Sequence, residues 1–319
     1  WGKLIIEIDG YVKFEDKPHA EVLSQMRREN WLKEQGYEII RLFPFEILRD
    51  AEGCELMSDG DPRFWTGRAP ILFPIVGRLK NDRLRHDGKT YPMTQHGFAR
   101  DRRFAWVEQG TQSCKLALSD DAETRARYPF AFRLEVTYAV DGADLEVGFE
   151  IINTGDEMLP ASLGGHPAFN WPLVPGLPKE AYTLTFGKTE PAPIRRLKDG
   201  LMRPQPEPNP VKGRTLALTE ELFDDDAMVF DQIASTSILF TATLGPAAAT
   251  QGPAIEISWR GFRELGVWSK VGGAPFLCIE PWHGYASPAE FEGEFADKPG
   301  LLQIAPGARR SLSYRIRVS

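Results

Sequence analysis

The sequence predicts a mainly β fold, a large antiparallel sandwich, and three observations support this prediction. From about residue 49 onward, short alternating apolar and polar segments are interrupted by Gly, Pro and Asp. The same region has no long segment with helical periodicity. Of the 319 residues, 42% are hydrophobic and 26% are charged, a composition that can bury a full core. Because a half-buried sheet must cover its apolar face, so many strands favour two packed sheets.

Residues 1–48 have a different pattern, which predicts a strand, a helix and a second strand. Residues 4–8 are a β-branched run, residues 20–35 have helix-forming composition, and residues 37–42 form the second candidate strand. We therefore expect two parts, a short strand-helix-strand segment at 1–48 and a β-sandwich domain at 49–319.

The clearest strand pair lies in the middle of the chain. Residues 132–140 and 145–151 alternate with a period of two on either side of Asp141-Gly142, which predicts a hairpin with one buried face. The Pro-rich stretch 191–210 predicts a long surface loop. Further strands are predicted at 182–186, 237–244, 254–259, 265–269, 275–280 and 311–318.

Charge and cysteine content exclude several classes of protein. A net charge of -7 and a pI near 5.4 argue against binding to nucleic acid or to an anionic membrane. No apolar run approaches the roughly 18 residues of a membrane-spanning helix, and no signal peptide opens the chain. The three cysteines lack CxxC spacing and a nearby histidine, so we expect a reduced, cytoplasmic protein without a metal site.

Two histidines stand in unusual local sequences. His166, in SLGGHPAFNWP, follows two glycines and precedes a proline, which holds a polar ring in a tight backbone amid aromatic residues. His96, in QHGFARD, is followed by a glycine that allows close approach to the backbone. The alternatives are a hydrogen-bonded core histidine for His166 and a turn histidine for His96.

Glu280 is the most informative carboxylate. In PFLCIEPW, the period of two places Phe276, Cys278 and Glu280 on one face, and Pro281 keeps the strand end extended. Burying a lone carboxylate raises its pKa toward that of a useful general base. The alternative is an exposed glutamate at a strand end, paired with an arginine.

Other polar residues complete the candidate set. Arg78 follows an apolar run and a glycine, and its planar guanidinium suits oxygen ligands, although a surface arginine has the same pattern. The FDDDAM segment lacks the other ligands of a calcium loop, so one functional Asp among solvated neighbours is the better interpretation. There is no phosphate-binding glycine loop, GxSxG or HExxH, and the set suits proton transfer without a cofactor. Tryptophans beside these motifs could form the floor of a sugar site: Trp65, Trp171, Trp268 and Trp282.

These residues lie in segments that resemble the aldose 1-epimerase (galactose mutarotase-like) family, in its LacX-like branch. The segments are GDPRFWTGRAPILFPIVGRLKND, YPMTQHGFARD, LGGHPAFNWPL, LTEELFDDDAMVF and FLCIEPWHG. The resemblance implies a β-supersandwich and cofactor-free interconversion of the α and β anomers of an aldose. It makes Glu280 the base that takes the proton of the anomeric hydroxyl and His166 the acid that protonates the ring oxygen.

The resemblance also implies how the sugar is held. His96 would bind near the ring oxygen, while Arg78 and Asp226 would hold sugar hydroxyls, with Asp225 as the rival of Asp226. Trp282 would contribute to the substrate-binding surface. We expect the acid and the base to face each other across a gap one sugar ring wide. The sequence leaves open which aldose is bound, a hexose or a hexose phosphate.

Residues 1–48 instead resemble the tail of a restriction-endonuclease-like (DUF559 or Vsr-like) domain. There, Glu7 and Asp9 would be metal-binding carboxylates, but the upstream strand is absent and Lys13 is not at the ExK spacing. We therefore expect no working Mg²⁺ site. A carbohydrate-binding or sensing module with the same pocket remains the alternative function, and a nuclease acting through residues 1–48 is a third.

Overall fold

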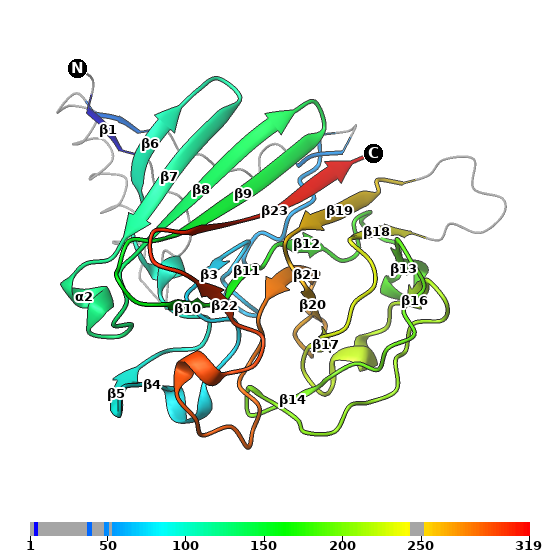
Figure 1. Ribbon diagram of the computed structural model, residues 1–319. Coiled ribbons are helices and arrows are strands. Elements are labelled where there is room, and N and C mark those ends of the chain that lie inside the picture. Colours follow the sequence, from blue (N-terminus) through cyan, green and yellow to red (C-terminus); the bar gives the residue numbers. More distant parts are fainter. Residues whose placement is uncertain (1–2, 6–36, 40–47, 51–52, 243–251) are drawn as a thin grey trace.

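Two antiparallel sheets dominate the computed structural model, which describes residues 3–5, 37–39, 48–50, 53–242 and 252–319. The larger sheet has nine strands in the order β16-β13-β18-β19-β23-β9-β8-β7-β6 (Figure 1). The smaller has the order β17-β20-β21-β11-β3, and β12 also pairs with β21. The predicted mainly β fold is thereby confirmed.

The elements have the following bounds. The larger sheet contains β6 (Ala105–Gln109), β7 (Ser113–Ser119), β8 (Phe132–Asp141), β9 (Asp144–Asn153), β13 (Tyr182–Phe186), β16 (Thr215–Ala217), β18 (Ser237–Ala242), β19 (Ile255–Arg260) and β23 (Arg309–Val318). The smaller contains β3 (Ile71–Leu72), β11 (Leu163–Gly165), β12 (Ala168–Asn170), β17 (Met228–Phe230), β20 (Glu264–Trp268) and β21 (Phe276–His283). The remaining pairs are β4 (Arg83–His86) with β5 (Lys89–Pro92), β10 (Leu159–Ala161) with β22 (Leu302–Ile304), and β14 (Leu197–Lys198) with β15 (Leu201–Met202).

Helical structure in the described residues is short. The α-helix α2 spans Ala122–Arg125. Its N-cap is Asp121, whose side chain accepts a hydrogen bond from the Thr124 backbone N–H. Single 3-10 turns occupy Lys80–Asp82, Ala99–Asp101, Lys179–Ala181, Glu220–Phe223 and Phe295–Asp297. Within the described ranges, no helix is long and apolar enough to cross a membrane.

The strands predicted from alternation are confirmed. The predicted hairpin is β8 and β9, which pair in register from Phe132–Asn153 to Asp141–Asp144. The other predicted strands correspond to β13, β18, β19, β20, β21 and β23. The stretch 191–210 is less loop-like than expected, because it contains the β14–β15 pair and the buried Ile194.

At the N-terminus, β1 (Lys3–Ile5) pairs with β2 (Tyr37–Ile39) in parallel. The rest of the predicted segment 1–48, including its helix at 20–35 and the carboxylates Glu7 and Asp9, lies almost wholly outside the described residues.

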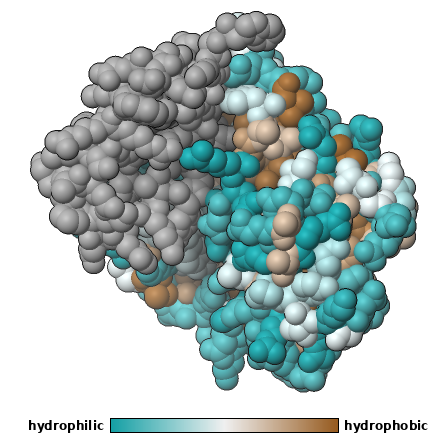
Figure 2. Space-filling model, turned by 90° about the vertical axis from the view of Figure 1, so that its left-hand side faces the viewer, coloured by the Kyte–Doolittle hydropathy of each residue, from teal (hydrophilic) through white to brown (hydrophobic). Residues whose placement is uncertain are grey.

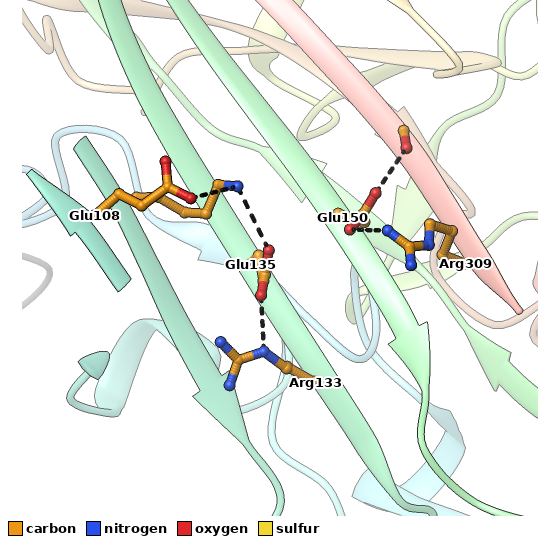
Figure 3. Close-up of polar contacts among 7 residues, drawn as sticks. Glu108, Arg133, Glu135, Glu150 and Arg309 are labelled. Atoms are coloured by element: carbon orange, nitrogen blue, oxygen red, sulfur yellow. Dashed lines mark hydrogen bonds and ion pairs between the residues drawn. The ribbon is translucent and has the colours of Figure 1, made fainter. Parts of the chain in front are cut away.

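One apolar cluster joins the two sheets. Inward residues such as Val136 and Phe149 belong to the same buried cluster as Leu277 and Ile279 of β21. The opposite face of the larger sheet is charged, and Figure 3 shows ion pairs along it, such as Arg133–Glu135 at 2.7 Å and Arg309–Glu150 at 3.1 Å. The coloured surface in Figure 2 is also mostly hydrophilic. Because side chains alternate along a strand, Glu280 projects from the face of β21 opposite to Leu277 and Ile279, away from this core.

Two glycines beside β21 make room for the Trp282 indole. A Cβ on Gly164 of β11 would lie 2.6 Å from Trp282 Cδ1, and one on Gly266 of β20 would lie 2.4 Å from its Cζ2. The indole therefore packs closely against the backbones of both neighbouring strands at these two glycines.

We expect Gly266→Ala to destabilise the protein by about 1–3 kcal/mol, because the added methyl group collides with a buried indole. Gly148→Ala, in the middle of β9, is the matched control, since its Cβ would meet nothing closer than 3.9 Å. Urea unfolding of both variants measures the difference. Equal stabilities for the two variants would contradict the prediction.

A buried acid and a buried amine lie near the end of β21. Glu264 accepts a hydrogen bond of 2.8 Å from the Gly284 backbone N–H, yet burial raises its pKa to about 7. Burial lowers the pKa of Lys298 to about 7, with the charge of Glu264 acting against that shift. Each group is therefore less readily ionised in the folded protein than in the unfolded chain.

This raised pKa predicts a pH dependence of stability. The folded protein binds the Glu264 proton more tightly than the unfolded chain does, so this contribution is fully present below pH 4.5 and is lost as pH rises to about 7. We expect the free energy of unfolding of Glu264→Gln, relative to wild type, to increase across this window by up to about 1.4 kcal/mol per pH unit. Urea unfolding at several pH values measures it, with the exposed Glu180→Gln as control; wild-type and Glu264→Gln curves that run parallel would disprove it.

Candidate active site

The strand register places His166 directly opposite Glu280. β11 and β12 both pair with β21, and His166 lies in the break between them. β11 and β12 pair with β21 in one common register, on either side of the break. Ala168 lies opposite Cys278, so His166, two residues before Ala168, lies opposite Glu280, two residues after Cys278. Residues directly opposite each other in an antiparallel pair project from the same face. The sheet therefore brings together two side chains that are distant in sequence.

The two side chains are in contact and almost fully buried. His166 Nε2 lies 3.2 Å from Glu280 Oε2, and the exposed fractions of the side chains are 8% and 2%. The distance is smaller than the ring-wide gap expected from the sequence. Within the described residues, neither Glu280 Oε2 nor His166 Nδ1 has a hydrogen-bond partner. Buried polar atoms without partners are costly, so this face of the sheet is suited to a polar ligand.

Burial acts on both groups against charge. It raises the pKa of Glu280 well above its ordinary value; hydrogen bonding from Trp282 opposes this shift, and the negative charge of Asp226 adds to it. It lowers the pKa of His166 to about 3. Without a ligand, the pair is therefore most stable as a protonated carboxyl beside a neutral imidazole. The proton of the Glu280 carboxyl is shared between the two groups, because its transfer to His166 would give a carboxylate beside an imidazolium.

Aromatic rings enclose the imidazole. Trp65 stacks on His166 with ring centroids 4.6 Å apart and an interplanar angle of 28°. Trp268 of β20 meets both rings edge-on, at 5.6 Å from Trp65 and 5.9 Å from His166. These rings pack around a buried imidazole, and electrostatic interactions are stronger in such a buried site than in water.

His96 lies next to this pair with a defined tautomer. Its ring centroid is 5.7 Å from that of His166. The Gly77 backbone N–H donates to His96 Nδ1 at 3.2 Å, so a neutral ring carries its proton on Nε2. Burial lowers the pKa of His96 well below its ordinary value, which favours this neutral form. His96 is therefore a neutral imidazole whose Nε2–H lies beside the Gln95 side-chain amide, 3.3 Å from its nitrogen.

The close backbone approach expected at Gly97 is present. His96 and Gly97 have φ values of 65° and 74°, and a Cβ on Gly97 would lie 2.2 Å from the Phe73 carbonyl oxygen. The His96 backbone N–H donates to the Gly77 carbonyl at 2.8 Å. Backbone contacts on both sides therefore hold this histidine in place.

Arg78 is held by an ion pair rather than by the His166–Glu280 pair. Its Nε and Nη2 donate to the two carboxylate oxygens of Asp82, each at 2.6 Å. Its Nη1 makes a long contact of 3.5 Å to the Asp199 carbonyl. Among the described residues, no hydrogen bond or ion pair joins Arg78 to His166 or Glu280, and Nη1 is the guanidinium nitrogen with the longest contact.

The two rival aspartates differ in their contacts. Asp225 pairs with Arg203 at 3.0 Å. Asp226 is exposed, adopts a φ of 67°, and accepts a 2.7 Å hydrogen bond on Oδ1 from the Ala227 backbone N–H. Its charge acts on Glu280, so its carboxylate is close enough to influence the pair electrostatically.

Trp282 lies on the same face as Glu280, two residues further along β21. Its side chain is buried, and hydrogen bonding from its indole to Glu280 acts to lower the pKa of that carboxyl, against the larger effect of burial. It therefore offers both an apolar surface and a donor beside the carboxyl group.

Sequence reasoning placed Cys278 on the face of Glu280 but gave it no part in the site. Its sulfur, His166 and Glu280 offer potential ligand atoms that all lie within 4.8 Å of one another. The alternation of β21 was the available signal. The second omission is the pair Gly164 and Gly266, whose importance depends on the Trp282 ring that they accommodate.

The chain is similar to known proteins in sequence and in fold. The plasmid-encoded protein LacX of Lactococcus lactis subsp. lactis is 31% identical over 280 residues, covering 85% of this chain and 92% of LacX. The galactose mutarotase related enzyme from Lactobacillus acidophilus superposes with a TM-score of 0.75 at 31% identity, over 84% of this chain and 88% of that one. A galactose mutarotase-like protein from Lactobacillus casei has a TM-score of 0.75 at 29% identity, with coverage of 84% and 91%.

A model of the family described as aldose 1-epimerase matches residues 49–299, which include every site residue discussed above. Because this match covers most of the chain and a curated relative exceeds 30% identity over most of its length, the chain belongs to the aldose 1-epimerase family.

Proposed function

We propose that this protein interconverts the α and β anomers of an aldose by general acid–base catalysis. The observation that carries the proposal is the contact of 3.2 Å between His166 and Glu280 in a buried, aromatic-walled site. Family membership supports a general role as a sugar epimerase or mutarotase. The residue roles below extend that general role to this chain.

The short separation fits the chemistry of the anomeric centre. The anomeric hydroxyl oxygen and the ring oxygen are both bonded to C1, so the base and the acid must reach two neighbouring oxygens. Two catalytic groups on opposite sides of a ring would be too far apart for that task. A carboxyl and an imidazole that already touch need only separate slightly to engage one oxygen each.

The reaction conserves the proton shared by the pair. When the sugar binds, the proton resides on His166 and Glu280 is a carboxylate. Glu280 then takes the proton of the anomeric hydroxyl while His166 protonates the ring oxygen, the bond between C1 and the ring oxygen breaks, and C1 becomes an aldehyde. Rotation about the C1–C2 bond presents the other face, and the ring closes with the two roles reversed.

Neighbouring residues would bind and orient the sugar. His96, as a neutral Nε2–H donor, would bind near the ring oxygen, and Asp226 would accept hydrogen bonds from sugar hydroxyls. Arg78 would offer Nη1 to a hydroxyl while Asp82 holds the rest of its guanidinium. Trp282 would provide an apolar surface for the ring.

Polarimetry of freshly dissolved α-glucose and α-galactose tests the proposal. We expect the wild type to accelerate the approach to anomeric equilibrium, and Glu280→Gln and His166→Ala to lower kcat by about 10²–10⁴-fold, because each removes one proton-transfer group. Glu264→Gln is the matched control, since it neutralises another buried glutamate of the same sheet and should keep its rate.

Identical rates with and without the wild-type protein would refute epimerase activity on these sugars. Saturable sugar binding by calorimetry, without faster exchange, would instead identify a carbohydrate-binding module. Full activity in Glu280→Gln would refute the assigned base.

A second experiment separates the two aspartates. We expect Asp226→Asn to raise KM about tenfold or more with a smaller change in kcat, because a hydrogen bond to a charged group contributes roughly 1.5–3 kcal/mol. Asp225→Asn, the matched control, should change KM less than twofold because this carboxylate is held by Arg203. Initial polarimetric rates over a range of sugar concentrations measure both. The opposite ranking would transfer the substrate contact to Asp225.

A further inference from the structure

We propose that His166, Cys278 and Glu280 form a binding site for Zn²⁺, and that the bound ion inhibits the enzyme. These residues offer an imidazole nitrogen, a sulfur and a carboxylate oxygen, and in the described part of the chain their ligand atoms all lie within 4.8 Å of one another. Zinc binding at these residues does not depend on the proposed function. Its effect on catalysis rests on the proposed function.

The strand geometry already approaches that of a tetrahedral site. Ligand atoms bound to one Zn²⁺ ion at about 2.0–2.3 Å lie roughly 3.5 Å apart. The His166–Glu280 contact of 3.2 Å is close to this spacing, and the widest separation, within 4.8 Å, must shrink by about an ångström. Cys278 and Glu280 project from the same face of β21, and the residue opposite the cysteine is the small Ala168.

A separate observation points to a ligand at this position. Glu280 Oε2, the oxygen that faces His166 Nε2, is buried without a hydrogen-bond partner in the described structure. Glu280 as a whole is 1% exposed and Cys278 is 0% exposed. A buried carboxylate oxygen without a partner, beside two further ligand atoms suited to a metal, fits a coordination site.

Charge and donor type favour a transition-metal ion such as Zn²⁺ over Mg²⁺ and Ca²⁺. A thiolate and a carboxylate together neutralise a doubly charged ion, so the complex adds no net charge to a dry pocket. The Cys278 thiol and the Glu280 carboxyl each release one proton to solvent on binding, whereas His166 binds in its neutral form. Mg²⁺ and Ca²⁺ prefer sets of oxygen ligands, and a sulfur–nitrogen–oxygen set favours Zn²⁺.

Inhibition follows from the residues that the ion would occupy. A coordinated His166 cannot carry the proton for the ring oxygen through that nitrogen, and a coordinated Glu280 is a weaker base. Cys278, in contrast, has no part in the proposed proton transfers. Replacing it should therefore separate metal binding from catalysis.

Titration with Co²⁺, a spectroscopic substitute for Zn²⁺, tests the site on the full chain. We expect one equivalent of Co²⁺ to produce a near-ultraviolet thiolate-to-cobalt charge-transfer band and the strong visible absorption of tetrahedral coordination. Zn²⁺ should displace the Co²⁺ and thereby remove both absorption features. Cys278→Ala should abolish the charge-transfer band and weaken Zn²⁺ binding at least tenfold in competition with a chelating dye. Cys114→Ala, which alters another buried cysteine on β7, should leave both unchanged.

The controls make each outcome decisive. Circular dichroism checks folding, and Cys278→Ser keeps the side-chain volume if the alanine variant unfolds. A wild type without the charge-transfer band, or a band that disappears in Cys54→Ser or Cys114→Ala but persists in Cys278→Ala, would overturn the proposal. Mg²⁺ should not displace Co²⁺, and displacement by it would also argue against this ligand set.

Polarimetry then measures the functional consequence. Zn²⁺ should slow anomer exchange by the wild type, EDTA should restore the rate, and Cys278→Ala should remain active at the Zn²⁺ concentration that inhibits the wild type. Equal inhibition of the wild type and Cys278→Ala would refute inhibition through this site. If the wild type exchanged no anomers, the cobalt spectra would still decide whether the metal site exists, so the two proposals can fail separately.

Discussion

The contact between a buried imidazole and a buried carboxyl depends on one constraint, the common register of β11 and β12 against β21. A slip of one residue would turn Glu280 to the opposite face, where Leu277 and Ile279 pack in the apolar core between the sheets. The many strand pairings and the shared core oppose such a slip, because they specify which face of β21 is buried. The larger sheet thus contributes to the chemistry without supplying any of the principal site residues.

Local patterns made much of the fold predictable. The β8–β9 hairpin was recoverable because its alternation and its turn lie within one short stretch of sequence. The 191–210 stretch was harder to predict, because the β14–β15 pair is only two residues long on each side and its prolines conceal the pairing. Short strands carry too little alternation to be recognised without their partners.

The site was predictable in composition but less so in geometry. His166 and Glu280 could be nominated from their local sequences, since each is an isolated polar group in an apolar context. Their separation depends on a register between distant strands, which no local pattern encodes, and the expected ring-wide gap was therefore too large. Similarly, nothing near Arg78 in a linear reading shows that Asp82 would turn back and occupy two of its nitrogens.

The features that would suit this site to proton transfer also make it a potential metal site. Proton transfer between two neighbouring oxygens requires a base and an acid close together, with lone pairs not already satisfied by the protein. Transition metals require the same arrangement, and a sulfur two residues before the carboxylate supplies a third donor on the same strand face. In the metal-free site, burial favours neutral forms of His166 and Glu280, which limits the attraction for stray cations. Under the two proposals, the balance between these effects would set whether a metal ion or a sugar occupies the site, and Cys278 is the one residue of the three that could shift it without removing a proposed proton-transfer group.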